Sequence, residues 1–386
     1  MRCAPKPRTG AGSVSCWGRS PSPLLRRAEI ATKARPLVAV DAAPAARQVV
    51  TGTERYAREL LARLPAAAPE LEFVFYSGRP GIRAGIDLTV LPMARLWSQA
   101  RFPLRLWRTR PALFFAPAHV VPTLAPGRGT TVIHDLAFER FPNAYSLRDR
   151  SYLRWTTRWA VARCRLLLTV SQATANDLAE LYGVAPDRVV VAHPGIAAIT
   201  PLEADEVERR LARLGLRRPF ALQVGRVETR KNQVAALRAI EAGPDLSYVA
   251  AGGIADRVMA DLIAASPRAH LLGQTSERDL EAIWAAAEVA LVPSLYEGFG
   301  LPLLEAMARG VPVVAAANSS LTEVGADAAL YVDETADATA FAGVIASARG
   351  QRRQLVERGL ARAQQFDWGS TANIVAGVLR RLIERP

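Results

Sequence analysis

The stretch LVPSLYEGFGLPLLEAMARGVPVV, residues 291–314, holds the most informative pattern in the chain. An apolar run typical of a buried strand leads into Glu-Gly-Phe-Gly, and an apolar helical pattern follows. Gly298 and Gly300 let the backbone approach a ligand closely. Pro302 suits the first helical residue, because its missing N–H is no loss there. Such a turn needs the glycines, but it does not need the glutamate on each side of them.

Those two glutamates, Glu297 and Glu305, indicate a ligand. The free amides of the first helical turn and the helix dipole form an anion site, and we predict Glu305 in that first turn. A lone glutamate there would be explained by the dipole alone. A carboxylate also suits vicinal hydroxyls such as those of ribose or hexose, because it accepts two hydrogen bonds. The pair therefore predicts a ligand that joins a sugar, a diphosphate and a nucleoside.

A second loop, GRVETRKN at residues 225–232, presents Arg226 and Lys231 after another predicted strand. Two cations beside a helix N-terminus would neutralise a diphosphate without a metal, although a loop arginine such as Arg226 is often only solvated. Of the 49 basic residues three are lysines, and Lys231 is the only one beyond residue 36. In a chain that otherwise uses arginine, this lysine indicates a position that needs a compact charge.

Neither loop carries a familiar nucleotide fingerprint. In the first, Leu303 stands where a GxGxxG motif would place its third glycine. The second lacks the second glycine of a P-loop and the serine or threonine that would follow Lys231. The two loops are therefore expected to recognise a diphosphate in another way.

Strand patterns alternate with helix patterns along the chain, which favours parallel sheets with helices on both faces. Helices are predicted at residues 51–64, 172–183 and 204–215, among others. Strands are predicted at residues 36–42, 71–77, 112–117, 130–135, 165–171, 188–195, 219–225, 246–253, 269–273, 288–294, 311–317 and 328–333. In such sheets, ligands bind beyond the carboxyl ends of the strands. The expected fold class is α/β, with two Rossmann-like, doubly wound domains that face one cleft.

The length of 386 residues favours two domains over one. Residues 1–35 are predicted to be a disordered basic tail, or to precede the start codon that is used. The ordered parts are predicted as a first domain at residues 36–196, a second at 197–370 and a closing helix at 371–386.

The net charge is +13, and residues 1–36 contribute +7 of it. This segment lacks the continuous apolar region of a secretory signal. A polybasic tail can bind anionic lipid or nucleic acid, but we do not expect nucleic acid as a partner. Three cysteines without metal or disulfide spacing fit a reducing, cytoplasmic setting. We expect no transmembrane helix, because no apolar run reaches about 18 residues.

In the predicted first domain, His134 and Asp135 follow a strand, within VIHDLAFERFP. His134 is a candidate catalytic residue if that strand end faces the cleft, although a lone histidine is often structural. His119 and His193 are weaker candidates. Gly52 lies in a Thr-Gly-Thr sequence that opens a helix, and it could approach a phosphate or the acceptor.

Two segments, residues 101–110 and 146–165, combine arginines with aromatic residues. The second carries them on adjoining helical faces: Arg150, Arg154, Arg158, Tyr152, Trp155 and Trp159. Together the segments could form a surface for peripheral contact with a membrane. An ordinary helix with buried tryptophans and solvated arginines would show the same pattern.

Several motifs together resemble the retaining family-4 glycosyltransferases, which have the GT-B fold. They are VGRVETRKN, SLYEGFGLPLLEAMARGVPVV with its Glu-x7-Glu pair, NSSLTEVGADAALYVD, the first-domain His-Asp and TVSQATANDLAELYGV. The similarity covers residues 36–380. It implies an enzyme of polysaccharide biosynthesis that moves a hexose, of mannose or rhamnose type, from a nucleoside-diphosphate sugar to a hydroxyl of a glycan or lipid-linked acceptor. The first domain would bind the acceptor and the second the donor, with no cofactor and no metal.

The same resemblance assigns roles to single residues. His134, Asp135 and Glu297 would act near the transferred sugar, and Glu305 would bind the ribose hydroxyls. Retention would proceed on one face of the sugar, with the leaving phosphate assisting the incoming hydroxyl. The other donor-binding residues would be Gly52, Arg226, Lys231, Gly298, Phe299, Gly300 and Leu301.

One departure from the family pattern is AHPGIAAIT at residues 192–200, which lacks the usual acidic residue after its glycine. A phosphorylase of the same fold would need a cofactor lysine, but Lys231 is already assigned to phosphate. Two alternatives stay open: an epimerase with the GT-B fold, and a non-catalytic protein that binds nucleotide sugars or serves as a membrane scaffold.

Overall fold

The computed structural model describes residues 35–48, 51–81, 86–93, 97–243, 245–333 and 336–384. Its contacts divide the chain into Met1–Arg35 and a compact unit, Pro36–Pro386. Apart from Arg35, the basic tail predicted at residues 1–35 lies outside the described residues.

The first sheet has seven strands in the order β3-β2-β1-β4-β5-β6-β7, and all its pairings are parallel. The strands are β1 Leu37–Asp41, β2 Glu72–Ser77, β3 Leu88–Val90, β4 Leu113–Ala116, β5 Gly129–Ile133, β6 Leu167–Thr169 and β7 Val189–Val191. The strand order reverses between β1 and β4, and ligands bind at such a switch point in doubly wound sheets.

The second sheet has six strands in the order β10-β9-β8-β11-β12-β13, again all parallel. The strands are β8 Phe220–Val224, β9 Ser247–Ala251, β10 Ala269–Gly273, β11 Val289–Val292, β12 Val313–Ala316 and β13 Leu330–Val332. Here the switch point lies between β8 and β11. The Arg226–Lys231 loop follows β8 and the Glu-Gly-Phe-Gly loop follows β11, so both flank the switch point.

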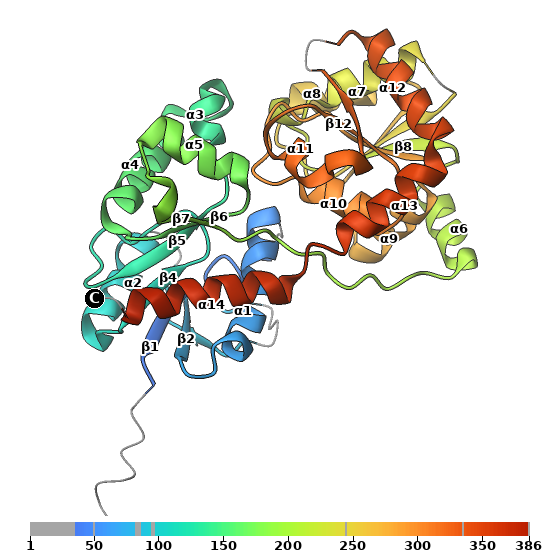
Figure 1. The fold of residues 1–386 in the computed structure, drawn as a ribbon. Coiled ribbons are helices and arrows are strands. Elements are labelled where there is room, and N and C mark those ends of the chain that lie inside the picture. The colour runs from blue at the N-terminus through green and yellow to red at the C-terminus, as the bar shows by residue number, and fades with distance from the viewer. Residues whose placement is uncertain are drawn as a thin grey trace, which may run out of the picture. The chain divides into compact units, whose positions relative to one another are not determined.

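Helices cover the faces of both sheets (Figure 1). They are α1 Gly52–Ala67, α2 Arg101–Thr109, α3 Ala137–Arg140, α4 Leu147–Arg163, α5 Gln172–Tyr182, α6 Ala204–Arg213, α7 Gln233–Ala242, α8 Arg257–Ala264, α9 Glu277–Ala286, α10 Leu301–Ala308, α11 Ser319–Gly325, α12 Ala338–Gly350, α13 Arg352–Ala363 and α14 Trp368–Glu384. The predicted α/β architecture of two doubly wound sheets is therefore confirmed. In the part of the chain that the structure describes, no helix is both long and apolar enough to span a bilayer.

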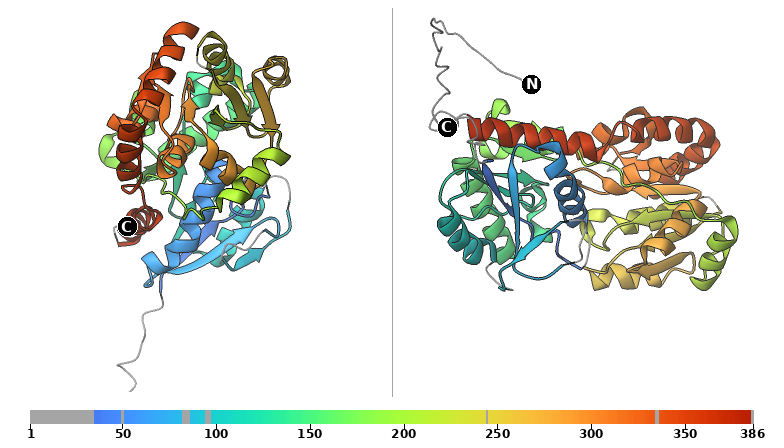
Figure 2. Two further views of the ribbon diagram at one scale, coloured as in Figure 1. Left: turned by 90° about the vertical axis from the view of Figure 1, so that its right-hand side faces the viewer. Right: turned by 90° about the horizontal axis from the view of Figure 1, so that it is seen from below.

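The last helix returns to the first sheet. α14 lies along α1 (Figures 1 and 2), where the rings of Trp368 and Tyr56 meet edge to face at 5.5 Å. Just before α14 begins, Phe366 contacts the segment that connects the two sheets. The Ile196 N–H in that segment donates to the Phe366 carbonyl at 3.1 Å. A Cβ on Gly195 would lie 2.3 Å from the Trp368 nitrogen. Only glycine fits that crossing.

Burial explains how the strands could be read from the sequence. Every residue of β4, β5, β11 and β12 is buried, and strands buried on both faces read as continuous apolar runs. The three-residue strand β3 is half-exposed and has no such run, so the sequence did not predict it. Helix α1 continues to Ala67, past the predicted end, with Pro65 inside it.

Candidate active site

The opening turn of α10 forms the centre of the site. Gly300 caps the helix with φ at +92°, a conformation that favours glycine, and the helix begins at Leu301. Pro302 is therefore the second helical residue and Glu305 the fifth. The prediction that Glu305 belongs to the first turn is wrong by one residue, because Gly300 and not Leu301 is the cap. Its carboxylate lies one turn above the free amides.

Glu297 is buried, and its partners come from its own domain. Lys231 Nζ donates to its Oε1, which also accepts the Ser294 hydroxyl at 2.7 Å. Arg230 Nη1 lies 3.5 Å from its Oε2. Burial is the largest influence on this carboxyl and would raise its pKa, but the Lys231 and Arg230 charges and the hydrogen bonds together hold the pKa below its ordinary value. Glu297 is therefore an anion at neutral pH.

The cations of the loop after β8 lie in two different environments. Lys231 is 13% exposed and points at Glu297. Arg226 is 57% exposed, and its nearest carboxylate oxygen, on Glu228, is 3.6 Å away. Arg230 was not predicted. It donates to the Tyr296 carbonyl at 2.7 Å and to Glu228 at 2.7 Å, and its position beside Lys231 in the sequence was the available signal.

Glu305 takes its partner from a helix of the first domain. Its side chain is 8% exposed, and its Oε1 accepts a hydrogen bond from Arg55 Nη1 in α1. Arg55 was not predicted as a site residue, since 250 positions separate the two in the chain. The start of α1 is close as well, because a Cβ on Gly52 would lie 3.3 Å from a Leu301 methyl carbon.

The Glu-Gly-Phe-Gly loop contacts the end of β5 directly. A Cβ on Gly298 would lie 2.0 Å from the His134 carbonyl oxygen and 2.9 Å from the Asp135 Cβ. The Gly298 carbonyl accepts the hydroxyls of Ser171 at 2.6 Å and Thr174 at 3.3 Å. Gly298 is therefore the point where the predicted donor loop touches the predicted catalytic His-Asp pair.

His134 is held by its own domain. Its Nε2 lies 2.8 Å from the Pro117 carbonyl, which requires a proton on Nε2 and leaves Nδ1 as the acceptor in the neutral ring. Its ring meets Tyr56 edge to face at 5.0 Å. Burial, the largest influence, lowers the pKa of His134 despite the Pro117 bond and the charges of Asp135 and Glu54. Asp135 accepts the Ala137 N–H at 3.0 Å.

Phe299 is oriented away from this cluster. Its buried ring packs against His193 at 5.9 Å and Phe366 at 5.6 Å, so only its backbone amide is available to a donor. His193 Nε2 lies 2.8 Å from Glu323 Oε1. His119 Nε2 lies 2.7 Å from the Thr157 hydroxyl. Both weaker histidine candidates therefore pair with groups outside the cluster.

Tyr296 is a further contact between the sheets that the sequence did not indicate. Its hydroxyl donates to Asp177 Oδ2 at 2.6 Å and accepts the Leu136 N–H at 3.2 Å. Arg140 holds the other oxygen of Asp177, with Nε at 3.0 Å. The residue before Glu297 is thus tied to α5 and to the segment after β5.

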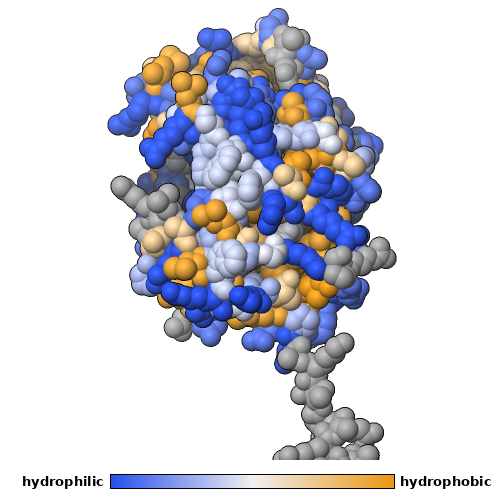
Figure 3. Space-filling view, turned by 90° about the vertical axis from the view of Figure 1, so that its left-hand side faces the viewer, coloured by the Kyte–Doolittle hydropathy of each residue, from blue (hydrophilic) through white to orange (hydrophobic). Residues whose placement is uncertain are grey.

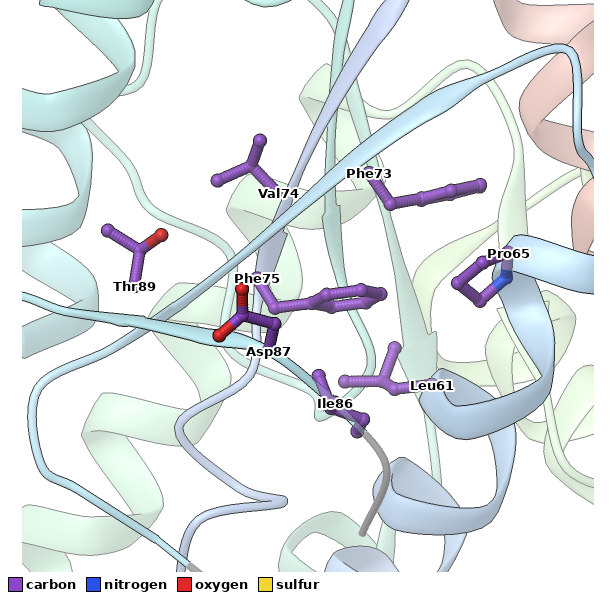
Figure 4. Close-up of a pocket in the computed structure, with 8 residues that line it drawn as sticks. All are labelled: Leu61, Pro65, Phe73, Val74, Phe75, Ile86, Asp87 and Thr89. Atoms are coloured by element: carbon purple, nitrogen blue, oxygen red, sulfur yellow. The ribbon is translucent and has the colours of Figure 1, made fainter. Parts of the chain in front are cut away.

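A separate cavity of about 290 Å³ lies in the first domain, between α1 and the β2–β3 edge (Figure 4). Six of its eight lining residues are apolar, and Asp87 and Thr89 are the two polar ones. None of the predicted site residues lines it. Among the described residues there is also no group of three or more His, Cys, Asp or Glu side chains placed to hold a metal ion.

Two family models match the chain. The model described as glycosyl transferases group 1 matches residues 205–359, and the model described as glycosyltransferase family 4 matches residues 50–198. The O-antigen chain mannosyltransferase B of Escherichia coli is 32% identical over 260 residues, which cover 62% of this chain and 67% of that protein. The chain belongs to the family-4 glycosyltransferases, and it is a glycosyltransferase.

Other relatives match over a smaller share of their length. An MMP alpha-(1->4)-mannosyltransferase of Mycolicibacterium hassiacum is 34% identical, over 57% of this chain and 54% of that protein. A D-inositol 3-phosphate glycosyltransferase of Mycobacterium sp. (strain JLS) is 35% identical, over 40% of this chain and 38% of that protein.

Solved structures establish the fold. Anabaena Alr3699/HepE in complex with UDP and glucose matches with a TM-score of 0.71 at 17% identity, over 89% of this chain and 99% of that one. Sucrose-phosphate synthase from Thermosynechococcus elongatus matches with a TM-score of 0.72 at 20% identity, over 91% of this chain and 100% of that one. The fold is GT-B, as the sequence predicted.

Proposed function

We propose that this glycosyltransferase moves a hexose from a nucleoside-diphosphate sugar to a hydroxyl of a glycan or lipid-linked acceptor, with retention at the anomeric carbon. The observation that carries the proposal is the pair of buried carboxylates around the opening turn of α10, with Arg226, Arg230 and Lys231 on the neighbouring loop. Two related mannosyltransferases, at 32% and 34% identity, favour a mannose-type donor; rhamnose is the second candidate.

The site offers one place for each part of such a donor. Glu305 is one turn into α10 and would accept the ribose hydroxyls. The amides of residues 298–301 and the cations of the β8 loop would hold the diphosphate. Glu297, which precedes Gly298, would accept hydroxyls of the hexose. Arg226 is the most exposed of the three cations and is free to turn toward a phosphate.

In the transfer step, the bond between the anomeric carbon and the phosphate oxygen breaks, and a bond to the acceptor oxygen forms on the same face of the sugar. The acceptor's proton passes to the leaving phosphate. Cations and helix amides at that phosphate stabilise the charge that develops there. The backbone of His134 contacts Gly298, and its neutral ring, with Nδ1 as a hydrogen-bond acceptor, would orient the hexose.

A panel of nucleoside-diphosphate sugars tests the proposal. Incubated without acceptor, the enzyme should release nucleoside diphosphate slowly from its own donor, and a Glu297→Gln variant should not. Donor binding without release or transfer, even with glycan acceptors, would instead identify a nucleotide-sugar-binding or scaffold protein. Conversion of the donor to an isomeric nucleotide sugar would identify an epimerase. The anomeric configuration of the transferred sugar, read by NMR, tests retention.

The positive charge at the diphosphate is proposed to come from the protein alone. Arginine, lysine and helix amides can neutralise a diphosphate without a cation. Turnover should therefore survive excess EDTA. Loss of turnover that Mg²⁺ or Mn²⁺ restores would overturn this part of the proposal.

We also propose that the α2 side of the first domain contacts an anionic membrane. Trp107 is 56% exposed, and its indole N–H donates at 2.9 Å to the backbone carbonyl of Leu124, whose side chain is also exposed. Arg108 beside them is exposed. On this side of the molecule hydrophobic and hydrophilic side chains are interspersed (Figure 3), a mixture that suits a lipid headgroup region.

The arginine pattern predicted on α4 contributes less to that surface. Arg154 is engaged by Glu139, with Nε at 2.8 Å from both oxygens, while Tyr152 and Trp155 are exposed. Sedimentation with vesicles that contain anionic lipid is expected at low salt, and it should weaken when Trp107 and Leu124 are replaced by serine. Equal sedimentation of the variant would exclude this surface.

A further inference from the structure

We propose that Arg55 is a displaceable cap on Glu305: it occupies the carboxylate in the donor-free enzyme, and the ribose of the donor takes its place. The inference rests on the proposed function, because it assumes that Glu305 binds ribose. It adds a residue of the first domain to the control of donor affinity.

The environment of Glu305 requires a partner when no donor is bound. Its side chain is 8% exposed, and a buried carboxylate without a partner is strongly destabilising. Among the described residues, Arg55 provides the one ion pair that Glu305 makes. Arg309, one turn further along α10, bonds the Glu305 carbonyl at 3.0 Å and uses its other nitrogens for Glu281. It therefore leaves the Glu305 carboxylate to Arg55.

The environment of Arg55 allows it to leave. Its side chain is 33% exposed, so its guanidinium can return to water when Glu305 changes partner. It projects from the first turn of α1, and Gly52 in the same turn approaches Leu301 at the start of α10. Arg55 therefore lies at the predicted nucleoside site, where the N-terminal turns of α1 from the first domain and α10 from the second domain meet.

Competition for one carboxylate has a measurable consequence. A fraction of the free enzyme has Glu305 covered, and the apparent dissociation constant is raised by the reciprocal of the uncovered fraction. If Arg55 loses its charge, Glu305 is uncovered and the nucleotide binds more tightly. If Arg55 were instead a direct ligand of the donor, the same change would weaken binding. The two roles predict opposite signs.

The experiment is a calorimetric titration of the parental enzyme and an Arg55→Met variant with the nucleoside diphosphate released from the donor. Methionine keeps the apolar stem and removes the charge. We expect the dissociation constant to fall about five- to tenfold, as for a partly exposed ion pair. Arg63→Met is the matched control, because Arg63 lies on the same helix and pairs with Glu59 at 2.6 Å; it should bind like the parent.

Each outcome decides the inference. Unchanged or weaker binding by Arg55→Met, with parental binding intact, overturns the cap and leaves the proposed function standing. A parental enzyme that binds no nucleoside diphosphate overturns both. Should Arg55→Met fail to fold, Arg55→Gln serves in its place, since its neutral amide can still donate to Glu305. It should also bind more tightly than the parent, and parental affinity would overturn the cap.

Discussion

Glu297 and Glu305 lie eight residues apart around one turn, yet they are satisfied in different ways. Glu297 is held by Lys231, Arg230 and Ser294, all from the second sheet and its loops. Glu305 is held by Arg55 from the helix that opens the first domain. In the donor-free protein, the carboxylate at the sugar end of the proposed donor site is therefore satisfied within one domain, whereas the carboxylate at the nucleoside end is satisfied across two. Replacements at the two glutamates should separate these cases.

The largest effect is expected on turnover at Glu297. Glu297→Gln keeps the size of the side chain but removes the charge that orients Lys231 and Arg230. Donor turnover should fall on the order of a hundredfold or more, as when a preorganised polar group is lost from an active site. Steady-state kinetics with the donor measure this. Glu228→Gln, which alters another partner of Arg230, is the control and should retain most activity.

Stability should distinguish the two glutamates next. Glu297→Ala leaves Lys231, at 13% exposure, without its partner, and breaking a buried pair in this way costs about 3 kcal/mol or more. Glu305→Ala leaves only Arg55, which water reaches. Urea unfolding should show a clearly smaller loss for Glu305→Ala. Equal losses would mean that the contact between the domains contributes as much to stability as the pair within one domain.

Lys231 gives a smaller, charge-conserving test. Its ammonium is a compact donor to Glu297, and the stem passes 3.7 Å from the place where a Cβ on Gly225 would lie. Arginine would bring a wide planar fork into this space. Lys231→Arg should lower turnover at least about tenfold, because a displacement of about 1 Å at a site can cost more than that. Turnover at the parental rate would remove Lys231 from the site.

The smallest effect concerns groups that burial keeps neutral. Burial lowers the pKa of His119 to about 4 from 6.5, with the Asp135 charge raising it and His134 lowering it, and the pKa of His134 is lowered as well. Because these pKa values are lower in the folded state, the unfolded chain binds more protons than the folded chain below pH 6.5. The contribution of the neutral histidines to stability is therefore fully present above that pH and is lost as the pH falls.

His119→Gln can keep a hydrogen bond to Thr157. When the pH falls from 7.5 to 5.5, the free energy of unfolding of this variant, measured with urea, should decrease by about 1 kcal/mol less than that of the parent. Glu297 acts at lower pH. Its lowered pKa stabilises the fold above about pH 4.5, and that contribution is lost as the pH falls through the folded pKa. Below about pH 4, where His119 is protonated in the folded parent as well, the His119 variant should follow the parental dependence of unfolding on pH. Identical dependence of the unfolding free energy on pH in both proteins would contradict the lowered pKa of His119.

The sequence predicted what local patterns determine. Buried parallel strands are apolar runs, and so both sheets and the loops that follow β8 and β11 could be placed. The loops' position at a switch point then follows from the strand order. The helix start was off by one residue, because Gly300 acts as the cap in a left-handed conformation. The preference of proline for the first helical position does not indicate that Gly300 adopts this conformation.

Contacts between distant segments could not be predicted. Arg55 and Glu305 are 250 positions apart, and Arg55 reads as an ordinary residue of an amphipathic helix. Arg226 was favoured over Arg230, but the tight turn at Thr229–Lys231 directs Arg230 and Lys231 to Glu297 and leaves Arg226 in solvent. Which way a side chain leaves a turn depends on backbone angles that the sequence does not show.

The most direct test of the division between the two carboxylates is the affinity for nucleoside diphosphate alone, which lacks the hexose. Measured by calorimetry, Glu305→Ala should weaken binding on the order of tenfold or more, since a hydrogen bond to a charged group contributes about 1.5–3 kcal/mol. Glu297→Gln should weaken nucleotide binding clearly less, because Lys231 and Arg230 remain as cations beside the diphosphate, while it loses turnover. Parental affinity in a folded Glu305→Ala variant would contradict the account, because Glu305 would then have no part in holding the nucleoside.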